Sequence, residues 1–92
     1  MANPIACKAV EILETSGWTQ DSYQNDKGQF CLMGAISQAV ILTKKDGQFS
    51  LLGQISKKIN PFSPFVATSI IGWNDTPGRT KEEVIDMLKE FC

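Results

Sequence analysis

Breaks rich in glycine, proline or polar residues divide this chain into five short apolar segments. The breaks are Thr15–Gly17 with the polar residues 18–30 after it, then Lys44–Gly47, Asn60–Pro64 and Thr76–Gly78. Within each segment apolar residues recur three or four positions apart, which is the spacing of one helix face. The pattern predicts a mainly α fold, a compact single-domain bundle of about five short helices spanning residues 1–92.

Two of the expected helices carry clear start signals. Asn3 can cap a helix whose first residue is Pro4, and Thr80 with Glu83 matches the S/T-x-x-E capping box. The apolar residues at helical spacing are Ile5, Ala6, Ala9, Val10 and Leu13, then Leu32, Met33, Ile36 and Val40, then Leu51, Leu52, Ile55 and Ile59, then Val66, Ile70 and Trp73, and finally the expected buried stripe Val84, Ile85, Leu88 and Phe91.

Two turns leave an alternative open. Asp-Gly pairs favour hairpins, so Asp26-Lys27-Gly28 and Asp46-Gly47 are candidate hairpin turns. A small hairpin within residues 18–30 is compatible with the helical bundle.

A short internal repeat suggests close packing. Residues 28–37 (GQFCLMGAIS) and 47–56 (GQFSLLGQIS) differ at only three of their ten positions. Each copy places a glycine inside a helix, where it costs about 1 kcal/mol relative to alanine. We therefore expect the second and third helices to cross closely at Gly34 and Gly53.

The composition limits the function. The length allows one modest core, with a folded surface of roughly 5,300 Å². The chain contains no histidine, which excludes Ser-His-Asp triads, Cys-His dyads and histidine-ligated zinc. No metal motif or phosphate-binding motif is present, so no cofactor is expected.

The three cysteines, Cys7, Cys31 and Cys92, are widely spaced and odd in number. That is a poor disulfide framework, and it predicts reduced thiols, with Cys7 and Cys31 packed as small apolar groups. The first residues lack the basic and apolar regions of a secretory leader, and no apolar stretch is long enough to cross a bilayer. A cytoplasmic location is expected.

Charge is unevenly distributed. Residues 43–60 carry four lysines and one aspartate, and residues 75–92 carry five acidic against three basic residues, which gives local charges of +3 and −2. Such a polarised surface can steer a partner or favour a homodimer. One lysine-rich segment without RNA-binding aromatics or a helix-turn-helix does not indicate nucleic-acid binding.

Two polar segments that contain aromatic residues are candidate binding surfaces. The candidate residues are Trp18, Gln20 and Tyr23 in the long loop, and Trp73, Asn74, Asp75 and Arg79 at the corner before the last helix. Loop aromatics can anchor interfaces. The residues before the last helix are more typical of a rigid corner with Trp73 in the core, because Asn and Asp side chains bind backbone amides in turns. Trp18, directly after Gly17, is more typical of a side chain that packs back on the preceding helix.

The chain contains the motifs Gly17-Trp18-x-Gln20, Gly28-x-x-Cys31-x-x-Gly34-Ala35 and Trp73-Asn74-Asp75, followed by Arg79-Thr80 and Glu83-Val84. Together they resemble a known pattern. It is that of small uncharacterised proteins of bacteria and their phages, which carry a domain of unknown function. The resemblance implies a short helical domain that usually stands alone, and it implies no reaction, substrate or cofactor. The lysine-rich segment and the Pro61/Pro64 pair depart from the pattern.

These observations favour a non-catalytic interaction protein, phage-encoded on the strength of the resemblance, that binds and modulates a host protein or defence system. Two alternatives remain open. One is a small-molecule binder, with a pocket framed by Trp18, Trp73, Gly34 and Ala35. The other is a thiol-dependent enzyme or redox sensor that uses Cys31, whose place near a helix start could lower its pKa.

Overall fold

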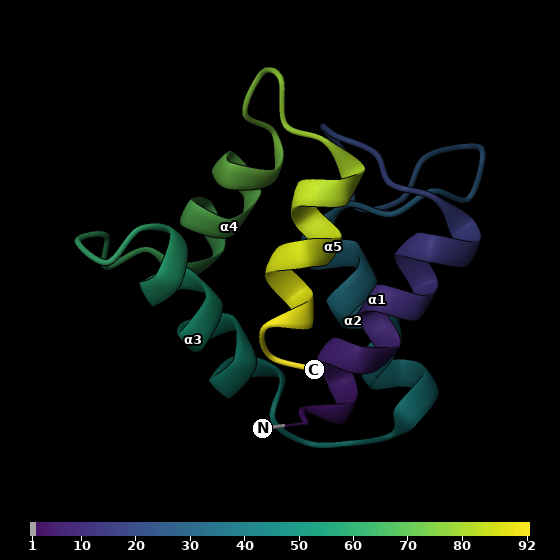
Figure 1. Cartoon of the computed structure of the whole chain (residues 1–92), viewed down its shortest axis with the longest axis horizontal. Helices are drawn as coiled ribbons and strands as arrows, with labels where there is room; N and C mark the ends of the chain where they lie inside the picture. The colour runs from purple at the N-terminus through teal and green to yellow at the C-terminus, as the bar shows by residue number, and fades with distance from the viewer. Residues whose placement is uncertain (1) are drawn as a thin grey trace.

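The computed structural model describes residues 2–92 and contains five helices, as the sequence predicts (Figure 1). Their bounds are α1 Pro4–Ser16, α2 Leu32–Thr43, α3 Gln48–Ile59, α4 Val66–Asn74 and α5 Lys81–Lys89. No strand forms within the described residues. The mainly α, single-domain architecture is confirmed, and the accessible surface of 5349 Å² agrees with the value expected from chain length.

Both predicted helix starts are confirmed. The Asn3 side chain accepts hydrogen bonds from the backbone N–H groups of Ile5 and Ala6, at 3.0 and 3.2 Å. Thr80 and Glu83 form the reciprocal capping box. A capping side chain satisfies backbone donors that the first helical turn leaves without a partner.

In Figure 1, α5 runs down the middle of the molecule, α1 lies on the right with α2 behind it, and α3 and α4 form a pair on the left; α1 packs against both α2 and α5. The core joins residues from all five helices. Its largest fully buried side chains include Ile5, Leu13, Leu32, Ile36, Leu51, Ile55, Ile70 and Leu88. Val66, the first residue of α4, is 37% exposed, whereas Ile70 one turn later is fully buried.

The loop of residues 18–30 folds back on itself without forming strands. The Phe30 N–H donates to Gly17 O, and Phe30 O accepts from Thr19 N, each at 3.0 Å. A tight turn closes where Asn25 N donates to Gln29 O. The hairpin considered at residues 18–30 is therefore reduced to isolated bridges, and the hairpin considered at Asp46-Gly47 is wrong because Gly47 caps α3.

The close approach predicted at Gly34 and Gly53 takes a different form. A Cβ at Gly34 would overlap the backbone carbonyl oxygen of Tyr23, whose carbon would lie 2.9 Å away. A Cβ at Gly53 would meet nothing within 4 Å. The prediction of a tight crossing of α2 and α3 is wrong, because it is the long loop that packs on α2 at Gly34.

The two glycines should respond to alanine in opposite directions. Gly34→Ala should lower the free energy of unfolding by roughly 1–3 kcal/mol, because the new methyl group pushes against backbone. Gly53→Ala should raise it by up to about 1 kcal/mol through helix propensity. Urea denaturation of both variants measures this, and equal effects would contradict the assigned loop contact.

The cysteines differ from the sequence-based expectation. Cys7 on α1 and Cys92 at the C-terminus form a disulfide across a separation of 85 residues, whereas Cys31 is free and buried. The prediction of three reduced thiols is wrong for this pair. Sequence spacing could not reveal that the two ends of the chain meet, as they also do where Asn3 N donates to Phe91 O at 2.9 Å.

Removing the disulfide should destabilise the fold, because it closes almost the whole chain into one loop. Cys92→Ser should lower the free energy of unfolding by roughly 2–5 kcal/mol. A reducing agent should bring the wild type to the stability of the variant and leave the variant unchanged. A wild type whose melting temperature does not respond to reductant would contradict the pairing.

Candidate functional site

Asn74, the last residue of α4, is the centre of a hydrogen-bond network that joins three parts of the chain. Its Oδ1 accepts from Trp18 Nε1 at 2.7 Å and from Leu32 N at 3.0 Å. Its Nδ2 donates to Thr19 O at 3.2 Å and to Asp75 Oδ1 at 2.9 Å. Only 1% of Asn74 is exposed, so one buried amide ties the long loop and the start of α2 to the end of α4.

Gln20 and Asp75 extend this network to the turn after α4. Gln20 Nε2 donates to the backbone oxygens of Asn74 and Thr76, at 3.0 and 3.1 Å. The Asp75 carboxylate accepts from the backbone N–H of Asp21 at 3.0 Å. These bonds hold loop and turn together over a separation of more than 50 residues.

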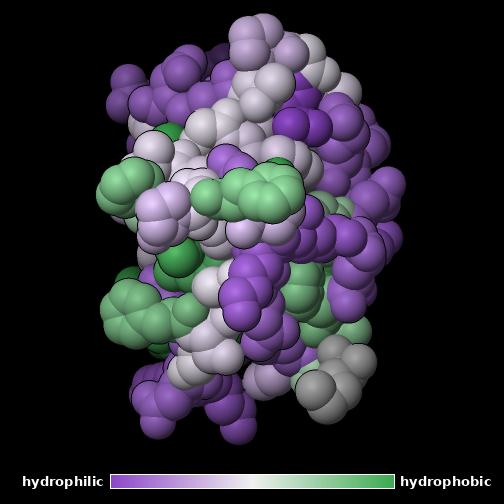
Figure 2. Space-filling model, turned by 90° about the vertical axis from the view of Figure 1, so that its left-hand side faces the viewer, coloured by the Kyte–Doolittle hydropathy of each residue, from purple (hydrophilic) through white to green (hydrophobic). Residues whose placement is uncertain are grey.

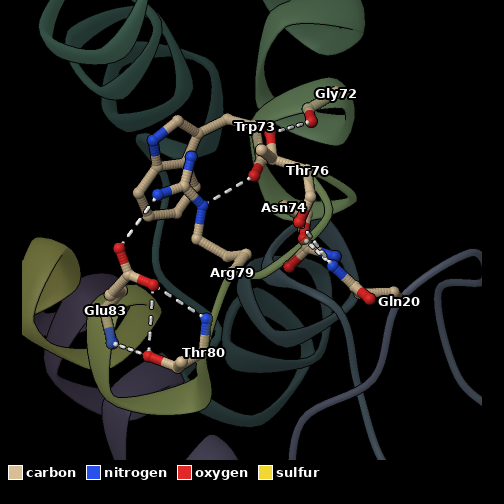
Figure 3. A network of polar contacts seen from close by, with 8 residues as sticks. All are labelled: Gln20, Gly72, Trp73, Asn74, Thr76, Arg79, Thr80 and Glu83. Atoms are coloured by element: carbon tan, nitrogen blue, oxygen red, sulfur yellow. Dashed lines mark hydrogen bonds and ion pairs between the residues drawn. The ribbon is translucent and has the colours of Figure 1, made fainter.

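Arg79 connects the turn to the start of α5 (Figure 3). Its guanidinium carbon lies 4.0 Å from the centroid of the Trp73 ring, a cation–π arrangement. Its Nε donates to Trp73 O at 2.9 Å, and its Nη1 donates to Glu83 Oε2 at 3.1 Å. The other Glu83 oxygen accepts from the Thr80 N–H, and this bond lowers the pKa of Glu83 from its usual value.

Six of the seven predicted site residues therefore come together, with most of their polar atoms bound to one another or to backbone. Tyr23 is the exception, since its side chain is 54% exposed and forms no part of the network, whereas its carbonyl accepts from Cys31 N at 3.1 Å. The arrangement is that of a rigid corner, which we call the Asn74 corner: Trp18, Gln20, Trp73, Asn74, Asp75 and Arg79.

Cys31 caps α2 and is 5% exposed, and its Sγ accepts from Gly34 N at 3.3 Å. Burial raises the pKa of the Cys31 thiol above its ordinary value, so the thiol form dominates at neutral pH. A hollow of about 80 Å³ lies beside it, lined in part by Tyr23, Ile71 and Asn74. The features of a reactive thiolate, a lowered pKa and good exposure, are therefore lacking here.

Exposed phenylalanines are the feature that the sequence reasoning missed. Phe49, Phe62 and Phe65, three of the five phenylalanines in the chain, are 85%, 95% and 68% exposed. Phe62 and Phe65 belong to the connection between α3 and α4, and apolar groups stand out among polar ones on that side of the molecule (Figure 2). The position of Phe62, outside every helical stripe and next to Pro61, was the available signal.

The chain belongs to a family of unknown function (DUF6197), whose model matches residues 5–91. No curated protein and no solved structure matches the chain. None of the helices in the described part is long and apolar enough to cross a membrane. Among residues 2–92, no three potential metal-binding side chains of His, Cys, Asp or Glu cluster together.

The burial of Asn74 should make its amide costly to remove. Asn74→Ala leaves buried donors and an acceptor without partners, and should lower the free energy of unfolding by roughly 2–4 kcal/mol. Asn25→Ala is the matched control, because the Asn25 side chain also forms four hydrogen bonds but is only half-buried. Water can replace its partners, so we expect a loss below about 1 kcal/mol. Equal losses in chemical denaturation would contradict the central role of Asn74.

Proposed function

We propose that the protein is a non-catalytic interaction protein that binds another protein through the connection between α3 and α4. The single observation that carries this proposal is the exposure of Phe62 and Phe65 on one short loop. Each exposed phenylalanine forgoes roughly 1.5–3 kcal/mol of burial. Clustered exposed apolar groups are typical of interaction sites.

The loop presents these side chains in a defined conformation. Pro61 and Pro64 restrict its backbone, Ser63 N donates to Asn60 O at 3.2 Å, and Ser63 Oγ accepts from Phe65 N at 3.1 Å. A preformed loop loses little conformational entropy on binding. We call residues 60–65 the phenylalanine loop.

The Asn74 corner supports this surface from within. It fixes the end of α4, and the phenylalanine loop leads into the start of the same helix. We therefore assign the corner residues a positioning role and move the expected contact surface to the loop. Tyr23, exposed and outside the network, remains a candidate contact.

The proposal extends to the biological setting. Resemblance to phage-borne proteins supports a host protein or a defence system as the target, and a cytoplasmic site of action. Disulfides persist in oxidising compartments and are rare in the cytosol. Action in the cytoplasm therefore requires the protein to stay folded with Cys7 and Cys92 reduced, which the Cys92→Ser measurement addresses.

Photo-crosslinking tests the contact surface directly. A photoreactive phenylalanine analogue at position 62 or 65 should give a discrete adduct with one protein in lysate of the bacterium that makes the chain. Position 49 is the matched control, because the exposure of Phe49 lies between those of Phe62 and Phe65, and Phe49 lies near the start of α3, about 15 Å along the helix axis from Ile59 at its end. It should give no such adduct.

Two results would contradict the proposal. Absence of an adduct at both loop positions would remove the phenylalanine loop as a contact surface. Similar labelling at positions 49, 62 and 65 would show non-specific apolar capture. An adduct of twice the chain mass would identify a second copy as the partner.

A further inference from the structure

A cleft lies beside the phenylalanine loop, where α3, α4 and α5 meet. It has a volume of about 470 Å³, and we call it the Trp73 cleft; its lining residues are Lys58, Ile59, Trp73, Glu83, Asp86, Met87 and Glu90. Ile59, Trp73 and Met87 form its apolar floor. Glu83, Asp86 and Glu90 form an acidic rim along one face of α5, because residues three and four apart share a helix face.

The charge of the cleft is negative. Three carboxylates against one lysine give the lining a net charge of −2. Glu90 is paired with Lys58 at 2.8 Å and Glu83 with Arg79 at 3.1 Å, whereas Asp86 has no cationic partner within the described part of the chain. The exposed position of Asp86 on α5 leaves it available to a cation from outside.

A second, independent feature marks the adjoining hollow. This hollow, of about 310 Å³, shares Ile59 and Trp73 with the cleft and reaches Ser63 of the phenylalanine loop. Ser69 also lines it, is 9% exposed, and has a buried hydroxyl that finds no hydrogen-bond partner among residues 2–92. A buried hydroxyl without a partner is costly, and rotation of the Ser69 side chain toward the hollow would let a polar group of a bound segment reach its oxygen.

We propose that the Trp73 cleft binds a basic segment of the partner protein, with its lysine or arginine side chains on the acidic rim and an apolar side chain on the floor. Charge complementarity selects the cation, and the aromatic floor distinguishes a peptide from a simple polycation. The proposal rests on the proposed function and specifies the chemistry of the partner. The two hollows and the phenylalanine loop then form one continuous docking surface.

Selection from a random-peptide display library on the immobilised wild-type protein tests this chemistry. We expect the enriched peptides to combine lysine or arginine with aliphatic or aromatic residues. Binding of a synthetic enriched peptide should weaken as salt is added. No enrichment, or enrichment without basic residues, would overturn the inference.

Charge reversal locates the binding site. Asp86→Lys should weaken binding of the enriched peptide by about tenfold or more. Glu82→Lys makes the same change of charge on the same helix but outside the cleft. It should alter binding of the peptide by less than about twofold. Equal effects of both variants would show general electrostatics and would overturn the site.

A spectroscopic readout separates the cleft from the rest of the surface. The chain has two tryptophans, and the indole N–H of Trp18 is bound to Asn74. The enriched peptide should therefore shift the NMR signal of the Trp73 indole N–H and leave that of Trp18 in place. Spermine is the control for a simple polycation without apolar side chains. If spermine bound as tightly as the peptide, the apolar floor would contribute nothing, and the assignment to a peptide would be overturned.

The outcomes also distinguish this inference from the proposed function. A specific adduct at position 62, together with peptide binding that Asp86→Lys does not affect, would keep the phenylalanine loop and overturn the cleft. Peptide binding in the cleft without any adduct at positions 62 and 65 would keep the cleft and overturn the phenylalanine loop as a contact surface. Self-association that Asp86→Lys abolishes would identify a second copy as the occupant and overturn the assignment to a partner protein.

Discussion

The hydrogen bonds of the Asn74 side chain are the interaction on which the rest of the structure depends. One buried amide accepts from the Trp18 indole and from the backbone of Leu32, and donates to the backbone of Thr19. It thereby joins the long loop, α2 and α4, which no common helix or sheet holds together. Because such an amide has both donors and acceptors, no apolar residue of similar size could make the same connection.

This network gives the motif before α5 a structural role. The Trp-Asn-Asp segment, Arg79 and the Thr80–Glu83 capping box form a chain of contacts from the end of α4 to the first turn of α5. Their polar atoms are largely engaged within the protein. In this chain the motif therefore has a structural role, because it holds the end of α4 against the start of α5.

The remaining surface separates into regions of different chemistry. The phenylalanine loop is apolar and preformed, and the Trp73 cleft next to it combines an aromatic floor with carboxylates. The lysine-rich segment and the acidic α5, which the sequence shows as two blocks of opposite charge, meet at the ion pair between Lys58 and Glu90. This contact reduces the charge separation that the sequence suggests. Among the carboxylates that line the Trp73 cleft, Asp86 is the one without an ion-pair partner in the described part of the chain.

The sequence by itself determined the five helices, their caps and most of the core, because these depend on neighbours three or four residues away. The helix caps at Asn3 and Thr80 and the apolar stripe from Leu51 to Ile59 could be predicted from such local spacing. The sequence also placed the six residues of the Asn74 corner in polar segments near turns. Only the tertiary structure decided that Cys7 meets Cys92 and that Gly34 contacts the Tyr23 backbone and not α3. The reason is that these contacts join distant segments, and local spacing carries no information on which distant segments meet.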